Sequence, residues 1–139
     1  MFRSILVIVL LSCCQLLCAQ SSPADQDHQI SIFFGGGSYY IDGQQANDLK
    51  TFLDEIPNIE WYEVELQGRT DDIGNRAYNM RLSEMRVRAV KALLMDYPLP
   101  EEMMIMIPLG EEDPTFDNAT WEGKLSNRRV DIILKRIVF

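Results

Sequence analysis

The chain contains 139 residues, of which 21 are acidic and 13 are basic, and its formal net charge at pH 7 is −8. This length accommodates one domain. Nucleic acids and anionic membrane surfaces both require clustered lysine and arginine, so a chain this acidic is not expected to bind either of them.

Residues 1–19 have the layout of a secretory signal peptide. Arg3 precedes an apolar run from Ile5 to Leu11, and small residues follow around Ala19. The apolar run is too short to span a membrane as a helix, so we expect export and cleavage after Ala19. An alternative is lipoprotein processing at Cys13, which would attach the chain to a membrane. All three cysteines lie in this leader, so cleavage after Ala19 would leave a mature chain without thiols or disulfides.

Residues 20–28 are polar and predict a short tether, so the folded domain is expected to cover residues 29–139. The apolar run Ile30–Phe34 predicts a strand, which three consecutive glycines end at Gly35–Gly37. Apolar residues at helical spacing in residues 43–56 predict a helix, which Pro57 ends. From Ile59 to Gln67, apolar and polar residues alternate, and this indicates a strand with one buried face.

A second helix is predicted from Ala77 to Met95, where apolar residues again recur at helical spacing. Residues 103–107 predict a short apolar strand, and Asp117 or Asn118 is expected to cap a brief helix at residues 119–125. Alternation in residues 130–137 predicts the last strand. The order β-α-β-α-β-(α)-β predicts an α/β fold, a two-layer sandwich with helices packed on one face of a mixed sheet.

Two adjacent acids, Asp71 and Asp72, lie in the loop between the second predicted strand and the second helix. Aspartates in such loops are commonly turn or capping residues, and spacing alone favours that interpretation. Most of the arginines, however, are concentrated around this loop and near the C-terminus. If these two stretches meet in space, an acidic protein presents one local cationic site.

Several motifs follow one another in this part of the chain. Gly68-x-Thr70-Asp71-x-x-Gly74 precedes Tyr78-Asn79-x-x-Leu82-Ser83-x-x-Arg86. The segments GEEDP at residues 110–114 and DNATWEGKLSNRRV at residues 117–130 come next. Together they resemble the OmpA-like peptidoglycan-binding domains, of the OmpA C-terminal, Pal and MotB type. The resemblance extends over nearly the whole of residues 29–139.

The resemblance implies a non-catalytic protein that binds the stem peptide of peptidoglycan, mainly through diaminopimelate. The free end of this residue carries an ammonium and a carboxylate on one carbon. Asp71 is then expected to accept from the ammonium, and Arg86 to bind the carboxylate with two parallel hydrogen bonds. The resemblance names further ligand candidates, which are Thr70, Asn79, Asn127 and Arg128. It implies no catalytic residue, cofactor or metal.

The same resemblance implies an exported protein of the bacterial periplasm, associated with the outer membrane. Its expected partners are peptidoglycan and outer-membrane or other envelope proteins. Two departures from the family pattern affect the site. Arg69 replaces a histidine and adds a cation that can pair with Asp71, and Gly35–Gly37 replace an acid of the first loop. An alternative function is therefore an envelope protein-protein interaction module with a weakened peptidoglycan site, which a filled groove at Asp71 and Arg86 would favour.

Overall fold

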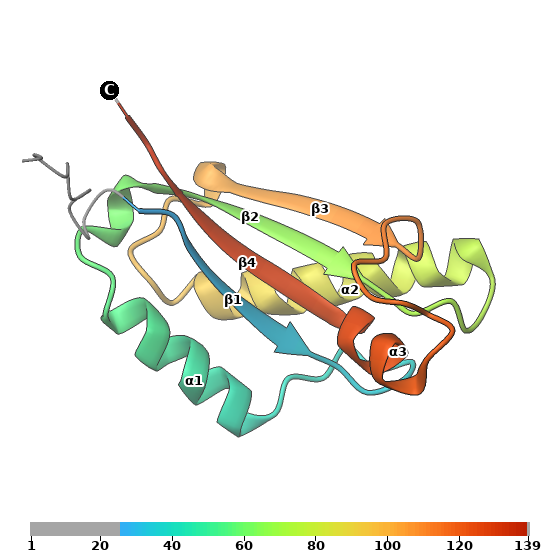
Figure 1. Cartoon of the computed structure of the whole chain (residues 1–139). Coiled ribbons are helices and arrows are strands. Elements are labelled where there is room, and N and C mark those ends of the chain that lie inside the picture. The colour runs from blue at the N-terminus through green and yellow to red at the C-terminus, as the bar shows by residue number, and fades with distance from the viewer. Residues whose placement is uncertain (1–25, 139) are drawn as a thin grey trace, which may run out of the picture.

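Residues 26–138 are described by the computed structural model, and they form a four-stranded sheet and three α-helices (Figure 1). In chain order the elements are β1 (His28–Phe33), α1 (Gly43–Asp54), β2 (Tyr62–Arg69), α2 (Arg76–Leu94), β3 (Met104–Gly110), α3 (Trp121–Asn127) and β4 (Arg129–Arg136). Short 3₁₀ helices cover Ile59–Trp61 and Glu101–Met103. The predicted leader and most of the predicted tether lie outside the described residues.

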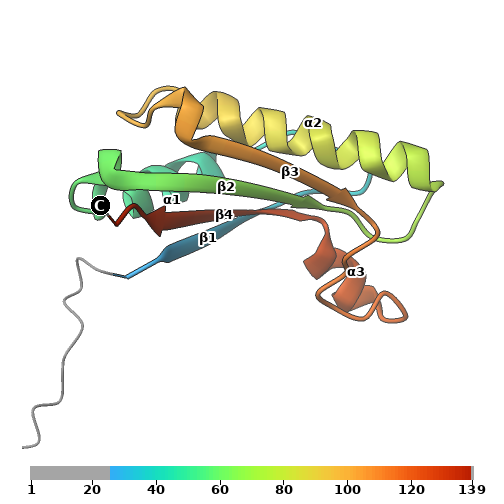
Figure 2. The same ribbon diagram turned by 90° about the horizontal axis from the view of Figure 1, so that it is seen from above.

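The sheet has the strand order β1-β4-β2-β3. β4 is antiparallel to both β1 and β2, whereas β3 is parallel to β2. α1 and α2 lie on one face of the sheet, and α3 lies at its end, just before β4 (Figure 1, Figure 2). The predicted two-layer α/β arrangement with a mixed sheet is confirmed.

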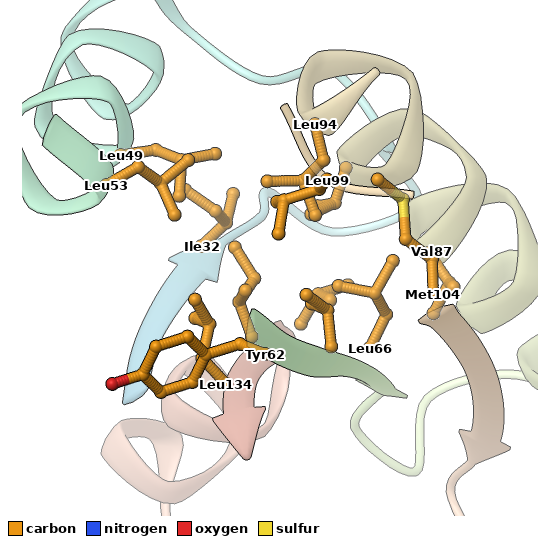
Figure 3. Packing of buried hydrophobic residues seen from close by; sticks show 14 of the residues in the cluster. Ile32, Leu49, Leu53, Tyr62, Leu66, Val87, Leu94, Leu99, Met104 and Leu134 are labelled. Carbon is orange, nitrogen blue, oxygen red and sulfur yellow. The ribbon is translucent and has the colours of Figure 1, made fainter. Parts of the chain in front are cut away.

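The hydrophobic core fills the space between the sheet and the two long helices (Figure 3). The alternation in β2 buries Tyr62, Val64 and Leu66, each at most 1 % exposed, and leaves the residues between them partly exposed. β4 buries Val130, Ile132 and Leu134 on the same face, but Arg129 and Asp131 on its other face are buried as well. Burial of one such apolar side chain contributes about 1.5–3 kcal/mol, so this apolar pattern strongly favours one register. The helices contribute Leu49 and Leu53 from α1 and Val87, Val90 and Leu94 from α2.

Several bounds of the elements differ from the sequence prediction. Residues 59–61, predicted as the start of a strand, form a 3₁₀ helix, and β2 begins at Tyr62. β1 begins at His28, so the last residue assigned to the tether belongs to the sheet. α3 is capped by Thr120, because Asp117 and Asn118 lie in the preceding turn. β3 continues beyond the predicted apolar run to Gly110, since its pairing with β2 extends that far.

α2 approaches the sheet closely at Gly68, near the end of β2. A Cβ atom at this position would lie 2.6 Å from Val87 Cγ2 and 2.7 Å from the backbone oxygen of Ser83. Because glycine has no Cβ, it permits this approach where any other residue would displace the helix. The close approach lets Arg86, on the same side of α2, reach the backbone oxygen of Arg69 at 3.0 Å.

Candidate functional site

The candidate residues lie at one end of the sheet, where β1 and β2 end and β4 begins (Figure 1). Three segments meet there: the first loop, which we define as residues 35–38, the loop that carries Thr70 and Asp71, and the turn that carries Arg128. These segments are far apart in the sequence. The pairing of β4 with both β1 and β2 brings them together.

Asp71 forms an ion pair with Arg128. Its Oδ2 accepts a hydrogen bond from Arg128 Nε at 2.7 Å, and the two side chains are only 9 % and 8 % exposed. Thr70 is buried, and its hydroxyl donates to the backbone oxygen of Asp71 at 2.9 Å. The pair is therefore held at the surface of the domain but largely shielded from water, where charge-assisted hydrogen bonds are stronger than in solution.

Arg86 is buried behind this pair, and all three of its guanidinium nitrogens donate to backbone oxygens. Nε donates to Ser38 at 2.8 Å, Nη1 to Arg69 at 3.0 Å and Nη2 to Gly35 at 2.9 Å. The guanidinium also lies over the ring of Phe34, with 5.0 Å from Cζ to the ring centroid. Arg86 therefore fastens the first loop to the end of β2.

Burial lowers the pKa of Arg86 to about 10. The negative charge of Asp71 acts in the opposite direction and raises this pKa, while the positive charge of Arg128 lowers it further. Arg86 consequently remains a cation at neutral pH. Two positive charges and one negative charge meet at this end of the sheet, which leaves a local positive excess in an acidic protein.

Arg128 presents hydrogen-bond donors that the protein itself does not use. Within residues 26–138 its Nη1 and Nη2 groups make no hydrogen bond, whereas its Nε donates to Asp71. The guanidinium lies over the ring of Trp121, 5.1 Å from the centroid. A Cβ on Gly36 would lie only 3.4 Å from Nη1, so the first loop passes directly beside this cation.

The two asparagines among the candidates make different contacts. Asn79 is 1 % exposed, and its Nδ2 donates to the carboxylate of Glu111. Asn127 is fully buried, and its side-chain amide bonds both backbone groups of Phe116 and the side chain of Asn118. Because both Nδ2 hydrogens are used in these bonds, Asn127 orders the loop before α3 and does not present donors to the site.

Arg69 does not pair with Asp71. Its side chain lies on the helix-free face of the sheet, where it bonds Asp131 at 2.8 Å and Asp113 at 3.1 Å. Asp131 also accepts hydrogen bonds from Arg129 at 2.7 Å and from Ser31 at 2.6 Å. Sequence reasoning missed this network, although the alternation in β2 places Arg69 on the face opposite to Gly68.

The structure thus brings Thr70, Asp71, Arg86 and Arg128 together, but with contacts that differ from the predicted clamp. The first loop occupies the Arg86 guanidinium, and the cation bonded to Asp71 is Arg128. Within the run of glycines, Gly37 has φ +67, a backbone conformation that favours glycine and sets the path of the first loop.

Two further observations limit the chemistry of the described part of the chain. Within residues 26–138, no three His, Cys, Asp or Glu side chains are grouped so that they would hold a metal ion. None of the helices in this range has the length and apolar character needed to cross a membrane.

Comparison with known proteins identifies the family. The sequence profile described as the OmpA family matches residues 33–128. The chain belongs to the OmpA family. It is similar to the outer-membrane lipoprotein YfiB of Pseudomonas aeruginosa, with 31 % identity over 103 residues, which is 74 % of this chain and 61 % of YfiB. It is also similar to outer membrane porin F of the same organism, with 36 % identity over 104 residues, or 74 % of this chain and 30 % of the porin.

A solved structure supports the same assignment. The crystal structure of the peptidoglycan-associated lipoprotein from Burkholderia pseudomallei superimposes with a TM-score of 0.68 and 26 % identity, covering 76 % of this chain and 89 % of that one. The chain spans less than two thirds of the length of the curated relatives described above. These relatives are outer-membrane proteins, in agreement with the cell-envelope location that the sequence predicts.

Proposed function

We propose that this protein binds peptidoglycan non-covalently and without catalysis, through the free ammonium and carboxylate of diaminopimelate in the stem peptide. The observation that carries this proposal is the shielded pair of Asp71 and Arg128, backed by the second cation Arg86. Similarity to a peptidoglycan-associated lipoprotein supports it.

The pair matches the chemistry of an amino-acid head group, which needs one anion and one cation a few ångströms apart. Asp71 accepts hydrogen bonds from the ammonium of the ligand. The free Nη1 and Nη2 groups of Arg128 donate to the carboxylate as a fork, which a lysine could not do equally well. The contact of 2.7 Å between Asp71 and Arg128 already sets the required spacing.

Arg86, for which the sequence predicts direct contact with the carboxylate, acts in this proposal as a positioning residue. It holds the first loop beside Arg128 and supplies positive charge behind the pair. Thr70 orients the Asp71 backbone, and Asn79 lies next to Gly74 at the start of α2. Each candidate thus shapes the site, but only Asp71 and Arg128 contact the ligand head group.

The residues around the site do not form a catalytic set. Residues 26–138 contain no cysteine, and the only histidine, His28, begins β1 at the opposite end of the sheet. Asp71 and Asp72 do not act as an acid and base pair, because Asp72 is bonded to Lys124 and Asp71 to Arg128. This arrangement suits binding rather than turnover.

Sedimentation with purified diaminopimelate-containing sacculi tests the proposal. We expect the parent protein to sediment, and Asp71→Asn and Arg128→Gln to bind at least about ten-fold more weakly, since each removes a charge-assisted hydrogen bond. Asp72→Asn is the matched control, because the Asp72 carboxylate is adjacent in sequence to Asp71 but is 49 % exposed and bonded to Lys124. Variants that fold normally and sediment like the parent would show that the site is wrongly assigned.

One observation favours the alternative function, an envelope protein-protein interaction module with a weakened peptidoglycan site. The first loop takes up the Arg86 nitrogens, as a filled groove would. If the parent protein does not sediment with sacculi, and in-cell crosslinking from the first loop captures an outer-membrane or envelope protein, the alternative replaces the main proposal.

We also propose that residues 1–19 direct export and that residues 20–28 lead into the OmpA-like domain of residues 29–139. The mass of the mature N-terminus distinguishes cleavage after Ala19 from lipidation at Cys13. An uncleaved chain would contradict both forms of processing.

A further inference from the structure

A small pocket opens between the first loop and α2. We call it the rim pocket, and its lining residues are Gly37, Tyr39, Tyr78, Arg81, Leu82 and Met85. Its volume is about 110 Å³. Four of the residues follow the spacing i, i+3, i+4 and i+7, so they share one face of α2. The first loop supplies the opposite wall.

Arg81 at this pocket is unusual among the basic residues of the chain. Arg3 is the only one of the 13 basic residues that lies outside residues 26–138. Within the described range every other lysine and arginine has an ion pair, hydrogen bond or ring contact, whereas Arg81 has none. In a protein with 21 acidic residues, an unpaired guanidinium beside a pocket is complementary to an anion from outside the chain.

The rim pocket is continuous with the proposed diaminopimelate site through the first loop. Ser38 accepts from Arg86, while its neighbours Gly37 and Tyr39 line the pocket. Gly36 lies beside the Arg128 guanidinium, and Gly37 adopts φ +67, a conformation that favours glycine. The Cβ position of Gly37 lies 3.2 Å from the Tyr78 hydroxyl at the rim pocket, and that of Gly36 lies 3.4 Å from Arg128 Nη1, so two successive residues of the loop join the two places.

We propose that the rim pocket is a second subsite, which binds the carboxylate-bearing residue joined to the diamino acid in the stem peptide. This inference rests on the proposed function. That neighbouring residue is a glutamate linked through its side-chain carboxyl group, so it carries a free α-carboxylate and two methylenes. Arg81 pairs with the carboxylate, and the rings of Tyr39 and Tyr78, about half-exposed, flank the methylenes.

The size of the rim pocket favours this occupant over a sugar ring of the glycan strand. An apolar cavity of roughly 150 Å³ holds a ring the size of benzene. The rim pocket, at about 110 Å³, is smaller, and it therefore suits a short chain. Its lining is largely apolar apart from Arg81 and the two tyrosine hydroxyls, as expected for methylenes that end in one anion.

Calorimetric titration with three ligands tests the inference. The ligands are free meso-diaminopimelate, N-acetyl-γ-D-glutamyl-meso-diaminopimelate and the same dipeptide with its glutamyl α-carboxylate converted to an amide. We expect the parent protein to prefer the dipeptide acid over the amide by about five-fold, the size of a partly exposed ion pair. Arg81→Gln is expected to remove this preference, and Tyr39→Ala to weaken both dipeptides.

Two matched controls separate local contacts from general effects of charge or surface. Arg88→Gln removes the same charge two turns along α2, where Arg88 is bonded to Glu84, and Tyr40→Ala removes a neighbouring ring that is 74 % exposed and does not line the rim pocket. Both are expected to retain the preference. Equal affinity of the parent for acid and amide, or equal losses in Arg81→Gln and Arg88→Gln, overturns the second subsite. If the parent does not bind free diaminopimelate, the proposed function itself fails.

Discussion

Replacing Arg86 by methionine should destabilise the protein in the absence of any ligand. Methionine fills a similar volume, so the change removes the guanidinium without opening a large cavity. The loss removes the Arg86 donors from three backbone oxygens, of which that of Gly35 also accepts from the Ser38 N–H at 3.2 Å. That of Arg69 is buried and costs about 1–3 kcal/mol when unpaired, whereas those of Gly35 and Ser38 can regain water and cost about 0.5–1 kcal/mol each.

The substitution also removes a buried charge. The desolvation cost of that charge, which is the cause of the lowered pKa of Arg86, is no longer incurred and offsets part of the loss. We therefore expect the free energy of unfolding to fall by about 2–4 kcal/mol. Urea unfolding followed by circular dichroism measures the change. Arg86→Lys, which retains the charge but not the fork, should fall between parent and methionine variant.

Arg88→Met is the matched control for this experiment. Arg88 lies on the same helix, is 66 % exposed and pairs only with Glu84, so its removal should cost less than about 0.5 kcal/mol. If Arg86→Met is no more destabilising than Arg88→Met, Arg86 does not fasten the first loop, and the original interpretation as a ligand contact would be preferred.

Three further predictions concern the scaffold around the site. Gly68→Ala should lower the free energy of unfolding by about 1–3 kcal/mol, because the added Cβ meets Val87 at 2.6 Å; urea midpoints test this. Asn127→Ala should cost about 2 kcal/mol and speed proteolysis of residues 111–120, since three hydrogen bonds of the buried amide are lost. Lys135 lowers the pKa of Glu65 below its ordinary 4.5, so the stability advantage of parent over Glu65→Gln should be complete above pH 4.5 and vanish as pH falls below it; unfolding at pH 7 and pH 3 checks the sign.

The sequence was sufficient for the fold because burial imposes a clear period on each element. The alternation of Val64 and Leu66 in β2, and of Ile132 and Leu134 in β4, specifies which face of each strand is buried. The predicted sequence of strands and helices along the chain also follows from this pattern. The bounds at His28 and Thr120 were less predictable, since polar residues at element ends depend on local pairing and capping.

The site was only partly predictable from the sequence. The resemblance to the OmpA-like domains, and not spacing alone, brought Asp71, Arg86 and Arg128 into one hypothesis, and all three meet in the structure. The cation that bonds Asp71 depends on the path of the first loop, because this loop binds Arg86. Three consecutive glycines can adopt many backbone conformations, so the sequence does not predict that path. Likewise, the side of the sheet to which Arg69 points follows from register rather than from its nearness in sequence to Asp71.

The most direct test of the central claim compares two synthetic stem peptides that differ only in their third residue, meso-diaminopimelate or L-lysine. They differ by one carboxylate, the group assigned to Arg128. Calorimetric titration should give at least about ten-fold tighter binding of the diaminopimelate peptide, and this preference should disappear in Arg128→Gln. Equal binding of the two peptides by the parent protein, or an undiminished preference in Arg128→Gln, would contradict recognition of a zwitterionic head group by Asp71 and Arg128.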